Sequence, residues 1–521
     1  MSQLAYAGGT LGGLLANALS SHRHRTAFID AEGRRTSYAE LAQRIDQVIR
    51  TLDALGLEPG DTVAQLSGNR VEMFSVMAAA YLRGWRSLTL HTLNSADDHA
   101  HVLRDSAAKI LITESYFAPR VEQLRAQCTD VRHWLSHDPA DGLPDIWSLA
   151  APHEAAPLVC HGRPDDIIRL AYTGGTTGRP KGVMLSQRAM LANTLMWLAG
   201  LPWPDQAHCL CSAPISHGAG SLIFPTLARG GCVVLQRGFD KDRWLEAVAT
   251  HRIQYTFIVP TMLYALLDHP ATHETDLSSL QALIYGGAPA YPARLRQALN
   301  TFGPVLVQSY GQTEAPNTIL LLDQNAHAQA DERRLAAAGR PFPGIDVELL
   351  DTNNAPVAPG AVGEICVRGP LVMSGYHGQP EETERALDGG WLHTGDLATR
   401  DADGLFHIVD RKKDMIISGG FNVYPKEVED ALASHPDILA ASVIGVPDPK
   451  WGEAVKAIVV CRAGTHPSVE ALIEHVRQRK GAICAPKSID FVDALPLTGL
   501  GKPDRKALRQ SYWVDAERAV S

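Results

Sequence analysis

A stretch rich in glycine and hydroxyl groups, residues 171 to 182, carries the residue types that bind phosphate. It reads Ala-Tyr-Thr-Gly-Gly-Thr-Thr-Gly-Arg-Pro-Lys-Gly and follows an apolar run of strand type, residues 166 to 172. Glycines let backbone N–H groups turn toward an anion, while hydroxyls and a lysine add donors and positive charge. The sequence therefore predicts a phosphate-binding loop at the end of a strand, with an ordinary glycine-rich hairpin as the alternative.

A Walker A loop does not account for this stretch, because Arg179-Pro180 stands where that motif requires Gly-Lys. The stretch instead resembles the signature loop of the adenylate-forming superfamily, which includes acyl- and aryl-CoA ligases, amino-acid adenylation domains and luciferases. The resemblance extends from near residue 30 to near residue 510. It implies that ATP phosphates are bound by Thr173, Gly174, Gly175, Thr176, Thr177, Gly178 and Lys181.

The reaction implied by this resemblance solves a problem of leaving groups. A carboxylate is a poor acyl donor because it would have to expel oxide, whereas an acyl adenylate expels AMP. Forming that mixed anhydride by attack on the α-phosphate of ATP requires a pyrophosphate cradle, a metal ion, a nucleotide clamp and a positive charge. The resemblance therefore implies a ligase that uses ATP, Mg²⁺ and coenzyme A to convert a small carboxylic acid into acyl-CoA, AMP and pyrophosphate.

Two motifs that follow apolar strands resemble the adenine- and metal-binding segments of the superfamily. Residues 309 to 314 read Ser-Tyr-Gly-Gln-Thr-Glu, and residues 286 to 289 read Gly-Gly-Ala-Pro. Without the resemblance, the Thr-Glu pair is more typical of a helix cap, and the second motif of a strand-to-helix turn. The implied nucleotide contacts are Gly287, Ala288, Ser309, Tyr310, Gly311, Gln312 and Thr313, with Glu314 as the magnesium ligand and, together with Thr313, a catalytic residue.

The remaining nucleotide motifs lie later in the chain. Residues 391 to 396 read Trp-Leu-His-Thr-Gly-Asp, and the resemblance implies that Asp396 accepts both ribose hydroxyls, with Arg411 as a second ribose contact. Lys413 occupies the hinge position of the superfamily. Lys502, in a glycine-rich loop, matches the catalytic lysine that bridges the carboxylate and the α-phosphate. Taken alone, an aspartate at a glycine turn is a turn residue and a lysine in such a loop is solvated.

The acid pocket and the acceptor site are implied by weaker matches. No acidic residue occurs between Ser212 and Gly220, so a substrate ammonium group would be left unpaired, which disfavours α-amino acids. Four small residues from 218 to 221 favour a long or wide tunnel for the acyl group. The implied acyl contacts are His217, Gly218, Gly287, Gly311 and Ala315, and the implied CoA contacts are Gly419, Gly420 and Trp451. Ile483-Cys484-Ala485 departs from the aromatic and basic residues that some relatives place against CoA.

Two alternatives to a CoA ligase remain open. One is an adenylating enzyme that loads a free-standing carrier protein, and the other is a non-catalytic relative that binds nucleotide or acyl ligands without turnover. The joint presence of the metal, ribose and lysine motifs speaks against the second. Thioester formation with CoA alone distinguishes the first.

Alternating strand and helix patterns predict an α/β fold. Apolar residues recur at helical spacing after Ser37 and Glu40, which form a possible capping box, and short strands separate such helices. We expect a large N-terminal domain, residues 1–410, of α/β sub-lobes and a small β-rich sub-lobe, and a small mobile α+β C-terminal domain, residues 411–521. Residues 152 to 164, rich in Pro, His and Ala, are predicted to link two sub-lobes.

Composition limits the class of protein and its surroundings. The 521 residues carry a formal net charge of −9, which argues against nucleic-acid binding because phosphate neutralisation requires a basic surface. The eight cysteines lack zinc spacing and fit free thiols in a reducing compartment. No run approaches the ~20 apolar residues of a membrane span. These features predict a soluble cytoplasmic protein, with a homodimer left open.

Overall fold

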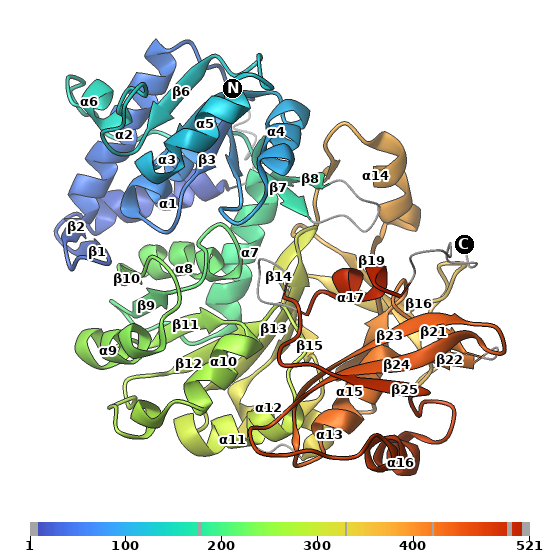
Figure 1. Cartoon of the computed structure of the whole chain (residues 1–521). Coiled ribbons are helices and arrows are strands. Elements are labelled where there is room, and N and C mark those ends of the chain that lie inside the picture. Colours follow the sequence, from blue (N-terminus) through green and yellow to red (C-terminus); the bar gives the residue numbers. More distant parts are fainter. Residues whose placement is uncertain (1–8, 174–179, 329–330, 419–420, 498–502, 513–521) are drawn as a thin grey trace, which may run out of the picture.

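Four sheets and the helices between them form the described part of this computed structural model, which covers residues 9–173, 180–328, 331–418, 421–497 and 503–512. The chain folds into a large mixed α/β N-terminal domain and a smaller C-terminal domain, coloured orange to red in Figure 1. The helices up to residue 200 are α1 (Leu11–Ser21), α2 (Tyr38–Ala54), α3 (Val71–Arg83), α4 (Ala96–Asp105), η1 (Ser115–Phe117), α5 (Ala118–Arg125), α6 (Ile146–Ala150) and α7 (Gln187–Gly200).

The helices beyond residue 200 continue to cover the sheets and also form part of the smaller domain. They are η2 (Gly218–Leu222), α8 (Ile223–Ala228), α9 (Lys241–His251), α10 (Pro260–Leu267), η3 (Pro270–His273), α11 (Pro292–Phe302), α12 (Gln324–Ala328), α13 (Glu332–Leu335), α14 (Pro380–Ala386), η4 (Asp388–Gly390), α15 (Pro425–Ala433), α16 (Val469–Lys480) and α17 (Arg505–Gln510).

The largest sheet has nine strands among the described residues, in the order β15, β14, β13, β12, β11, β9, β10, β1, β2. The neighbours from β13 to β1 are parallel, and the pairs at both ends are antiparallel. Its strands are β1 (Thr26–Ile29), β2 (Arg35–Ser37), β9 (His208–Cys211), β10 (Cys232–Leu235), β11 (Tyr255–Ile258), β12 (Ala282–Gly286), β13 (Leu306–Gln312), β14 (Ala315–Leu322) and β15 (Arg340–Pro341).

A second sheet runs in the order β18, β8, β7, β4, β3, β5, β6 and is parallel from β7 to β6. It contains β3 (Thr62–Leu66), β4 (Arg86–Thr89), β5 (Ala108–Thr113), β6 (His133–Ser136), β7 (Ile167–Thr173), β8 (Lys181–Ser186) and β18 (Gly375–Tyr376). Parallel strands of this kind are covered on both faces, and every residue of β3 is buried.

The prediction that residues 152 to 164 link two sub-lobes is wrong. The strand that follows it, β7, pairs with β4 in the same sheet, with Ser87 opposite Arg169. The segment is therefore a crossover within one sheet. Conversely, β1 and β2 at the start of the chain belong to the largest sheet, so the sub-lobes are not consecutive in sequence.

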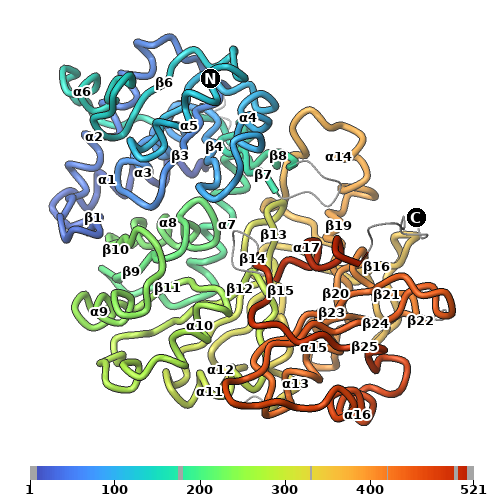
Figure 2. The backbone as a smooth tube through the Cα atoms, in the orientation of Figure 1, coloured from blue at the N-terminus to red at the C-terminus, as the bar shows by residue number. Residues whose placement is uncertain are grey.

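One antiparallel sheet and one mixed, largely antiparallel sheet complete the described part of the molecule. The third has the order β16 (Asp346–Leu350), β17 (Gly363–Arg368), β19 (Leu392–Arg400), β20 (Phe406–Arg411). The fourth belongs to the C-terminal domain and contains β21 (Ile416–Ser418), β22 (Phe421–Val423), β23 (Ile438–Asp448), β24 (Gly452–Cys461) and the parallel partner of β24, β25 (Ser488–Phe491). Figure 2 traces the path of the chain from one sheet to the next.

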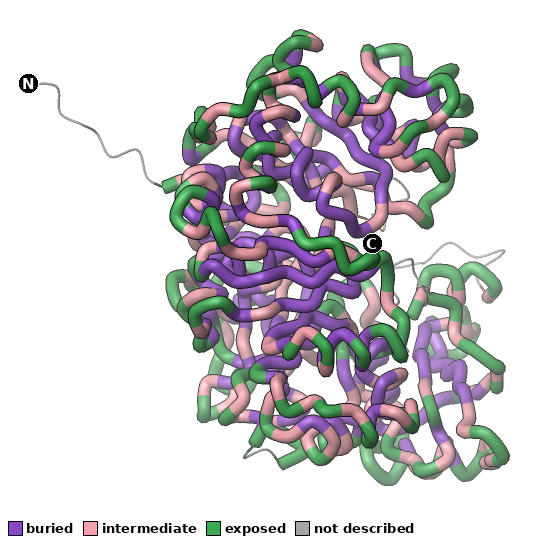
Figure 3. The backbone as a smooth tube through the Cα atoms, turned by 90° about the vertical axis from the view of Figure 1, so that its left-hand side faces the viewer, coloured by how far each residue is buried: buried purple, intermediate pink, exposed green. Residues whose placement is uncertain are grey.

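The C-terminal domain has an apolar core of its own. Buried side chains of the five strands β21 to β25 and of α15 and α16 pack together in a cluster that runs from Ile416 to Ile489. Figure 3 shows buried segments through the centre of each part and exposed segments at the periphery. Strand β20 continues through the predicted boundary at residues 410 and 411 and pairs with β19 as far as Arg411, so the boundary position itself stays a prediction.

Local sequence signals explain where several elements begin. Ser37 caps α2 in a capping box, because its hydroxyl accepts from the Glu40 N–H while the Glu40 carboxylate accepts from the Ser37 N–H at 2.7 Å. All eight cysteines are unpaired thiols, as their spacing predicted. Among the described residues, none of the helices combines the length and apolar character that a bilayer span requires.

Candidate active site

Three residues predicted from separate motifs meet at one carboxylate. Strands β19 and β20 place Asp396 directly opposite Arg411, and the Arg411 Nε lies 3.1 Å from the Asp396 Oδ1. The hydroxyl of Tyr310, at the end of β13, donates to the Asp396 Oδ2 at 2.6 Å. The Asp396 residue is 5% exposed, so these two donors fix the orientation of a nearly buried carboxylate.

The charges in this cluster reinforce one another. The Asp396 carboxylate raises the pKa of Arg411, so the guanidinium stays charged. Burial, together with the negative charge of Asp396, raises the pKa of Tyr310 well above its ordinary value. The phenol therefore remains protonated and acts as a donor. A carboxylate held in this way can accept two hydroxyl groups from a ribose ring if the ligand replaces or shares the existing donors.

The Thr-Glu pair lies at the tip of a hairpin and does not cap a helix. Gln312 at the end of β13 pairs with Ala315 at the start of β14, which leaves Thr313 and Glu314 as the connection. Gly311 is required beside this hairpin, because a Cβ there would lie 2.4 Å from the backbone nitrogen of Asn317. The hairpin thus presents both side chains beyond the carboxyl end of a strand in a largely parallel sheet, where ligands of α/β folds bind.

The adenine-wall motif also follows the end of a parallel strand. Gly286 ends β12, and a Cβ there would lie 2.3 Å from the backbone oxygen of Ser309 on β13. Gly287 has φ of 79°, in the left-handed region that favours glycine. These two glycines let the chain turn close to the Ser309–Tyr310 segment. The predicted contacts Gly287, Ala288 and Ser309 are therefore neighbours of the Asp396 cluster through β13.

Glu314 is attached to a distant part of the chain by both its backbone and its side chain. Its backbone oxygen accepts from the Met373 N–H at 2.8 Å, and its Oε1 accepts from the Tyr376 hydroxyl at 2.8 Å. The side chain is half-buried and offers hard oxygen atoms, the ligand type that Mg²⁺ prefers. Among the described residues, no cluster of three or more His, Cys, Asp or Glu could hold a metal by itself. This fits Mg²⁺, which is commonly held by one or two carboxylates and by substrate phosphates.

Lys181, the first residue of β8, is an ion-pair partner in this structure. Its ammonium lies 2.5 Å from the Glu382 carboxylate and 5.3 Å from the ring centroid of Tyr376. The hydrogen bond from Lys181 lowers the pKa of Glu382. A phosphate ligand at Lys181 would therefore compete with Glu382 for the ammonium.

His217 is held in a tightly packed segment before η2. Its Nδ1 lies 2.9 Å from the Ser216 hydroxyl oxygen, and its ring makes an edge contact with His91 at a centroid distance of 5.6 Å. Asn69, which is buried, donates to the backbone oxygen of Ala213 and accepts from the Ile215 N–H, so it fixes the segment that leads to His217. The acyl-binding role of His217 stays a prediction.

The small residues after His217 do not by themselves indicate a tunnel. A Cβ on Gly218 would lie 2.6 Å from the Phe257 ring, and a Cβ on Gly220 would lie 1.8 Å from the backbone oxygen of Ile215. Ser221 is occupied by a hydrogen bond from the Trp197 indole at 3.1 Å. Close packing in a full core accounts for these small side chains.

The predicted CoA contact Trp451 lies on the C-terminal domain beside two lysines. The ammonium groups of Lys450 and Lys487 lie 4.9 Å and 5.3 Å from the centroid of the Trp451 ring. Trp451 is 36% exposed.

Lys413, the predicted hinge, lies between β20 and β21. Burial and the nearby Arg411 lower the pKa of Lys413. Eight predicted residues lie outside the described residues: Gly174, Gly175, Thr176, Thr177, Gly178, Gly419, Gly420 and Lys502. Thr173 ends β7 just before that gap.

Three residues near the predicted site were not singled out from the sequence. Tyr376 contacts Glu314, Glu382 pairs with Lys181, and His91 contacts His217. His91 follows the carboxyl end of β4. Ligands of α/β folds bind beyond the carboxyl ends of parallel strands, so this position could have been singled out from the sequence. The other two come from a segment that joins the second sheet through β18, which residue spacing alone does not reveal.

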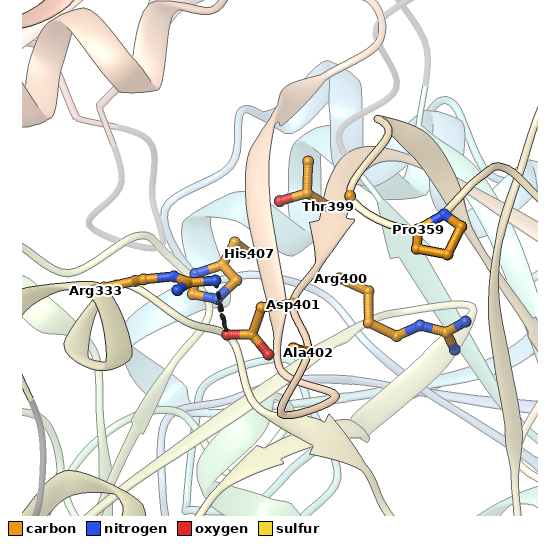
Figure 4. Close-up of a pocket in the computed structure, with 8 residues that line it drawn as sticks. Arg333, Pro359, Thr399, Arg400, Asp401, Ala402 and His407 are labelled. Carbon is orange, nitrogen blue, oxygen red and sulfur yellow. Dashed lines mark hydrogen bonds and ion pairs between the residues drawn. The ribbon is translucent and has the colours of Figure 1, made fainter.

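A cavity of about 430 Å³ lies elsewhere, near the turn that connects β19 and β20 (Figure 4). Asp401 in its lining is already occupied: it accepts from His407 at 2.9 Å and from the Leu405 N–H at 2.9 Å, and Arg333 lies 3.6 Å away. None of the predicted site residues lines this cavity.

Comparisons with known proteins agree with this arrangement. The family models for the AMP-binding enzyme and for the AMP-binding enzyme C-terminal domain match residues 15–377 and 427–502. The chain is 44% identical, over 98% of its length and 91% of the relative, to a medium/long-chain-fatty-acid–CoA ligase of Mycobacterium tuberculosis. It is 40% identical to a feruloyl-CoA synthase of Amycolatopsis sp, covering 94% of this chain and 96% of the relative. The solved structure of an amide bond synthetase from Marinactinospora thermotolerans matches with a TM-score of 0.89 at 36% identity, covering 97% of this chain and all of that one.

Proposed function

The chain belongs to the AMP-binding enzyme family, and from this we propose that it is an AMP-forming acid–thiol ligase. It activates a carboxylic acid with ATP to an acyl adenylate and then transfers the acyl group to coenzyme A, releasing AMP and pyrophosphate. The observation that carries the proposal is the meeting of Tyr310, Asp396 and Arg411 at one buried carboxylate. These residues come from distant motifs, and together they offer a ribose the pair of acceptor oxygens that it needs.

Each nucleotide group has a proposed partner. Asp396 accepts the ribose hydroxyls, Arg411 orients that carboxylate through its contact at 3.1 Å, and the Tyr310 ring provides a face for adenine. Thr313 and Lys181 donate to phosphate oxygens, which for Lys181 requires release from Glu382. Glu314 would hold Mg²⁺, which would supply neutralisation of the charge on the phosphates. Lys502 contributes the mobile positive charge at the reacting carboxylate and α-phosphate.

The two half-reactions are proposed to use different positions of the C-terminal domain, with Lys413 as the hinge. Contacts across the predicted boundary support a defined starting position. Asp410 accepts from the Lys426 N–H at 2.8 Å at the start of α15, and Arg505 lies 3.2 Å from the same carboxylate. Arg505 also contacts Glu429 at 2.7 Å. Rotation about Lys413 would have to break the contacts of Asp410 while preserving those within the C-terminal domain.

The acid is proposed to be fatty or aromatic. The segment from Ser212 to Gly220 presents no carboxylate to a substrate ammonium group. Burial lowers the pKa of His91, so the ring that contacts His217 is neutral at physiological pH. A neutral pocket suits an apolar acyl group. The fatty-acid and feruloyl ligases among the relatives agree with this substrate class.

Coenzyme A is the proposed acceptor. The exposed Trp451 ring with Lys450 and Lys487 beside it offers a stacking face and two positive charges, which suits the phosphorylated adenosine of CoA. An amine acceptor is a second candidate, because the solved amide bond synthetase is 36% identical over nearly the whole chain. A carrier-protein thiol is the third acceptor to be tested.

A substrate panel tests this function. Purified protein is incubated with ATP, Mg²⁺ and acids of graded chain length and aromaticity, and pyrophosphate release is measured. Product mass then identifies the acceptor when CoA, a primary amine or a phosphopantetheinylated carrier is added. We expect a CoA thioester from a fatty or aromatic acid. An amide or an acyl carrier as the sole product would replace CoA in this proposal.

The proposal includes a reducing cytoplasmic location, supported by the eight free thiols. Cell fractionation tests it. A homodimer is tested by light scattering of the purified chain.

A further inference from the structure

Tyr376 connects two parts of the proposed site that the sequence keeps far apart. Its hydroxyl donates to the Glu314 Oε1 at 2.8 Å, at the tip of the β13–β14 hairpin. Its backbone belongs to β18, where Tyr376 pairs with Val183 of β8. Strand β8 begins at Lys181, directly beyond the predicted phosphate loop. One residue therefore contacts the predicted metal ligand and the strand that leaves the phosphate loop.

The phenol is held rigidly at this position. The Tyr376 N–H donates to the Thr383 hydroxyl at 2.9 Å, and the His377 N–H donates to the Gly182 backbone oxygen at 2.7 Å. The Lys181 ammonium lies against one face of the ring. Gly375, with φ of 137°, allows this close packing, because a Cβ there would lie 2.6 Å from the Thr383 methyl group. The hydroxyl can therefore orient Glu314 without large freedom of its own.

In the hydrogen bond between Tyr376 and Glu314, the phenol is the donor and the carboxylate is the acceptor. The Tyr376 hydroxyl carries the proton of this hydrogen bond, and the Glu314 Oε1 accepts it at 2.8 Å. The bond uses one carboxylate oxygen, Oε1, and limits rotation of the group. The orientation of the second carboxylate oxygen of Glu314 is fixed as a result. Partners of this kind, which contact a metal ligand rather than the metal, commonly set metal affinity.

We propose that Tyr376 is a positioning residue that orients the Glu314 carboxylate for the divalent cation of the ATP complex. The inference rests on the proposed function, specifically on Glu314 as the metal ligand. Tyr376 touches neither the acid nor the nucleotide in this scheme and acts only through Glu314. Its removal should therefore weaken metal binding and leave metal-free nucleotide binding unchanged.

The test measures metal binding directly. Mn²⁺ is titrated into the full-length protein saturated with α,β-methylene-ATP, and free Mn²⁺ is followed by electron paramagnetic resonance. We expect Tyr376→Phe to raise the Mn²⁺ dissociation constant roughly 10- to 100-fold. Binding of the same analogue in EDTA should be the same as in the wild type. Tyr38→Phe is the matched control, since it removes a buried hydroxyl that donates to the Gly231 backbone oxygen, and it should bind Mn²⁺ normally.

A double-mutant cycle separates positioning from general damage. In the Glu314→Ala background, Tyr376→Phe should cause no further change in Mn²⁺ affinity, because its effect passes through the absent carboxylate. If Tyr376→Phe binds Mn²⁺ normally while Glu314→Ala binds it weakly, the positioning role of Tyr376 is wrong and the proposed metal ligand Glu314 still stands. An undiminished effect of Tyr376→Phe in the Glu314→Ala background would also overturn the positioning role. Normal Mn²⁺ affinity in Glu314→Ala would instead overturn the proposed metal ligand, and the inference with it.

Discussion

Replacement of Asp396 by asparagine is the sharpest test of the nucleotide clamp. The substitution preserves shape but removes the charge and one of the two acceptor oxygens. A hydrogen bond to a charged group contributes about 1.5–3 kcal/mol. Loss of one ribose contact of this kind should raise the KM for ATP roughly 10- to 150-fold, since 1.4 kcal/mol corresponds to a factor of ten. The effect on kcat should be smaller, because the ribose is remote from the reacting phosphorus.

Folding should be nearly unaffected by this change. The Arg411 side chain is 48% exposed, so water compensates much of the lost ion pair, and we expect a stability change of about 1 kcal/mol or less. Asp346→Asn is a matched control, because Asp346 also pairs with an arginine, Arg368, at 3.0 Å in the same sheet, and both side chains are exposed. The control should show wild-type KM values.

The assay compares ATP with 2′-deoxy-ATP in initial rates of pyrophosphate release. The wild-type protein should prefer ATP, and Asp396→Asn should lose most of that preference because the hydroxyl no longer meets a carboxylate. If the variant keeps both the wild-type KM and the wild-type preference, Asp396 does not bind the ribose and the proposed geometry is wrong.

Three further predictions address the lysines, the acid pocket and pH. Lys502→Ala should slow adenylation by roughly 10²–10³ yet still convert a supplied acyl adenylate and CoA to thioester, whereas Lys413→Pro should slow the second step more. His217→Ala should alter the preference among acids, measured by pyrophosphate release, more than it alters the KM for ATP. Burial lowers the pKa of His327 to about 4, so the unfolded chain binds the extra proton between about pH 4 and 6.5, and stability falls as the pH drops through that window. Between pH 7 and pH 5 this histidine should cost about 2 kcal/mol, and urea midpoints of His327→Gln should fall less than those of the wild type.

Each of these expectations has a contrary result. Equal loss of both half-reactions in Lys502→Ala, or normal thioester formation in Lys413→Pro, would contradict domain alternation. A uniform loss across all acids in His217→Ala would place that residue outside acid selection. An unchanged midpoint shift in His327→Gln would mean that other groups, such as the buried His137, carry the pH dependence.

Local patterns in the sequence predicted individual elements well. The capping signal at Ser37 and Glu40 starts α2, as predicted. Hydrogen bonding and side-chain period act over a few residues, so a short window contains the cause. The motif residues Tyr310, Asp396 and Arg411 were also predicted, and the structure brings them together. The distances between these three residues could not be predicted from the sequence, because they depend on how the strands that carry them are arranged.

Non-local pairing explains what the sequence did not predict. Residues 152 to 164 have linker composition, yet β7 returns to the sheet that β4 occupies. The Thr313–Glu314 pair has the composition of a cap but connects two strands because β14 pairs with β13. Tyr376 was missed for the same reason, since it joins the second sheet through the pairing of β18 with β8. The small residue at Gly218 is explained by the Phe257 ring of β11, which is distant in the sequence.

The path of the carboxylate oxygen tests the central claim most directly. In the proposed reaction an oxygen of the acid attacks the α-phosphate and remains on AMP after thioester formation. With a substrate acid labelled with ¹⁸O in both carboxylate oxygens, mass spectrometry should therefore find one ¹⁸O in AMP and one in the carbonyl of the CoA thioester, and the pyrophosphate should be unlabelled. Unlabelled AMP, or ADP with label in inorganic phosphate, would contradict activation through an acyl adenylate.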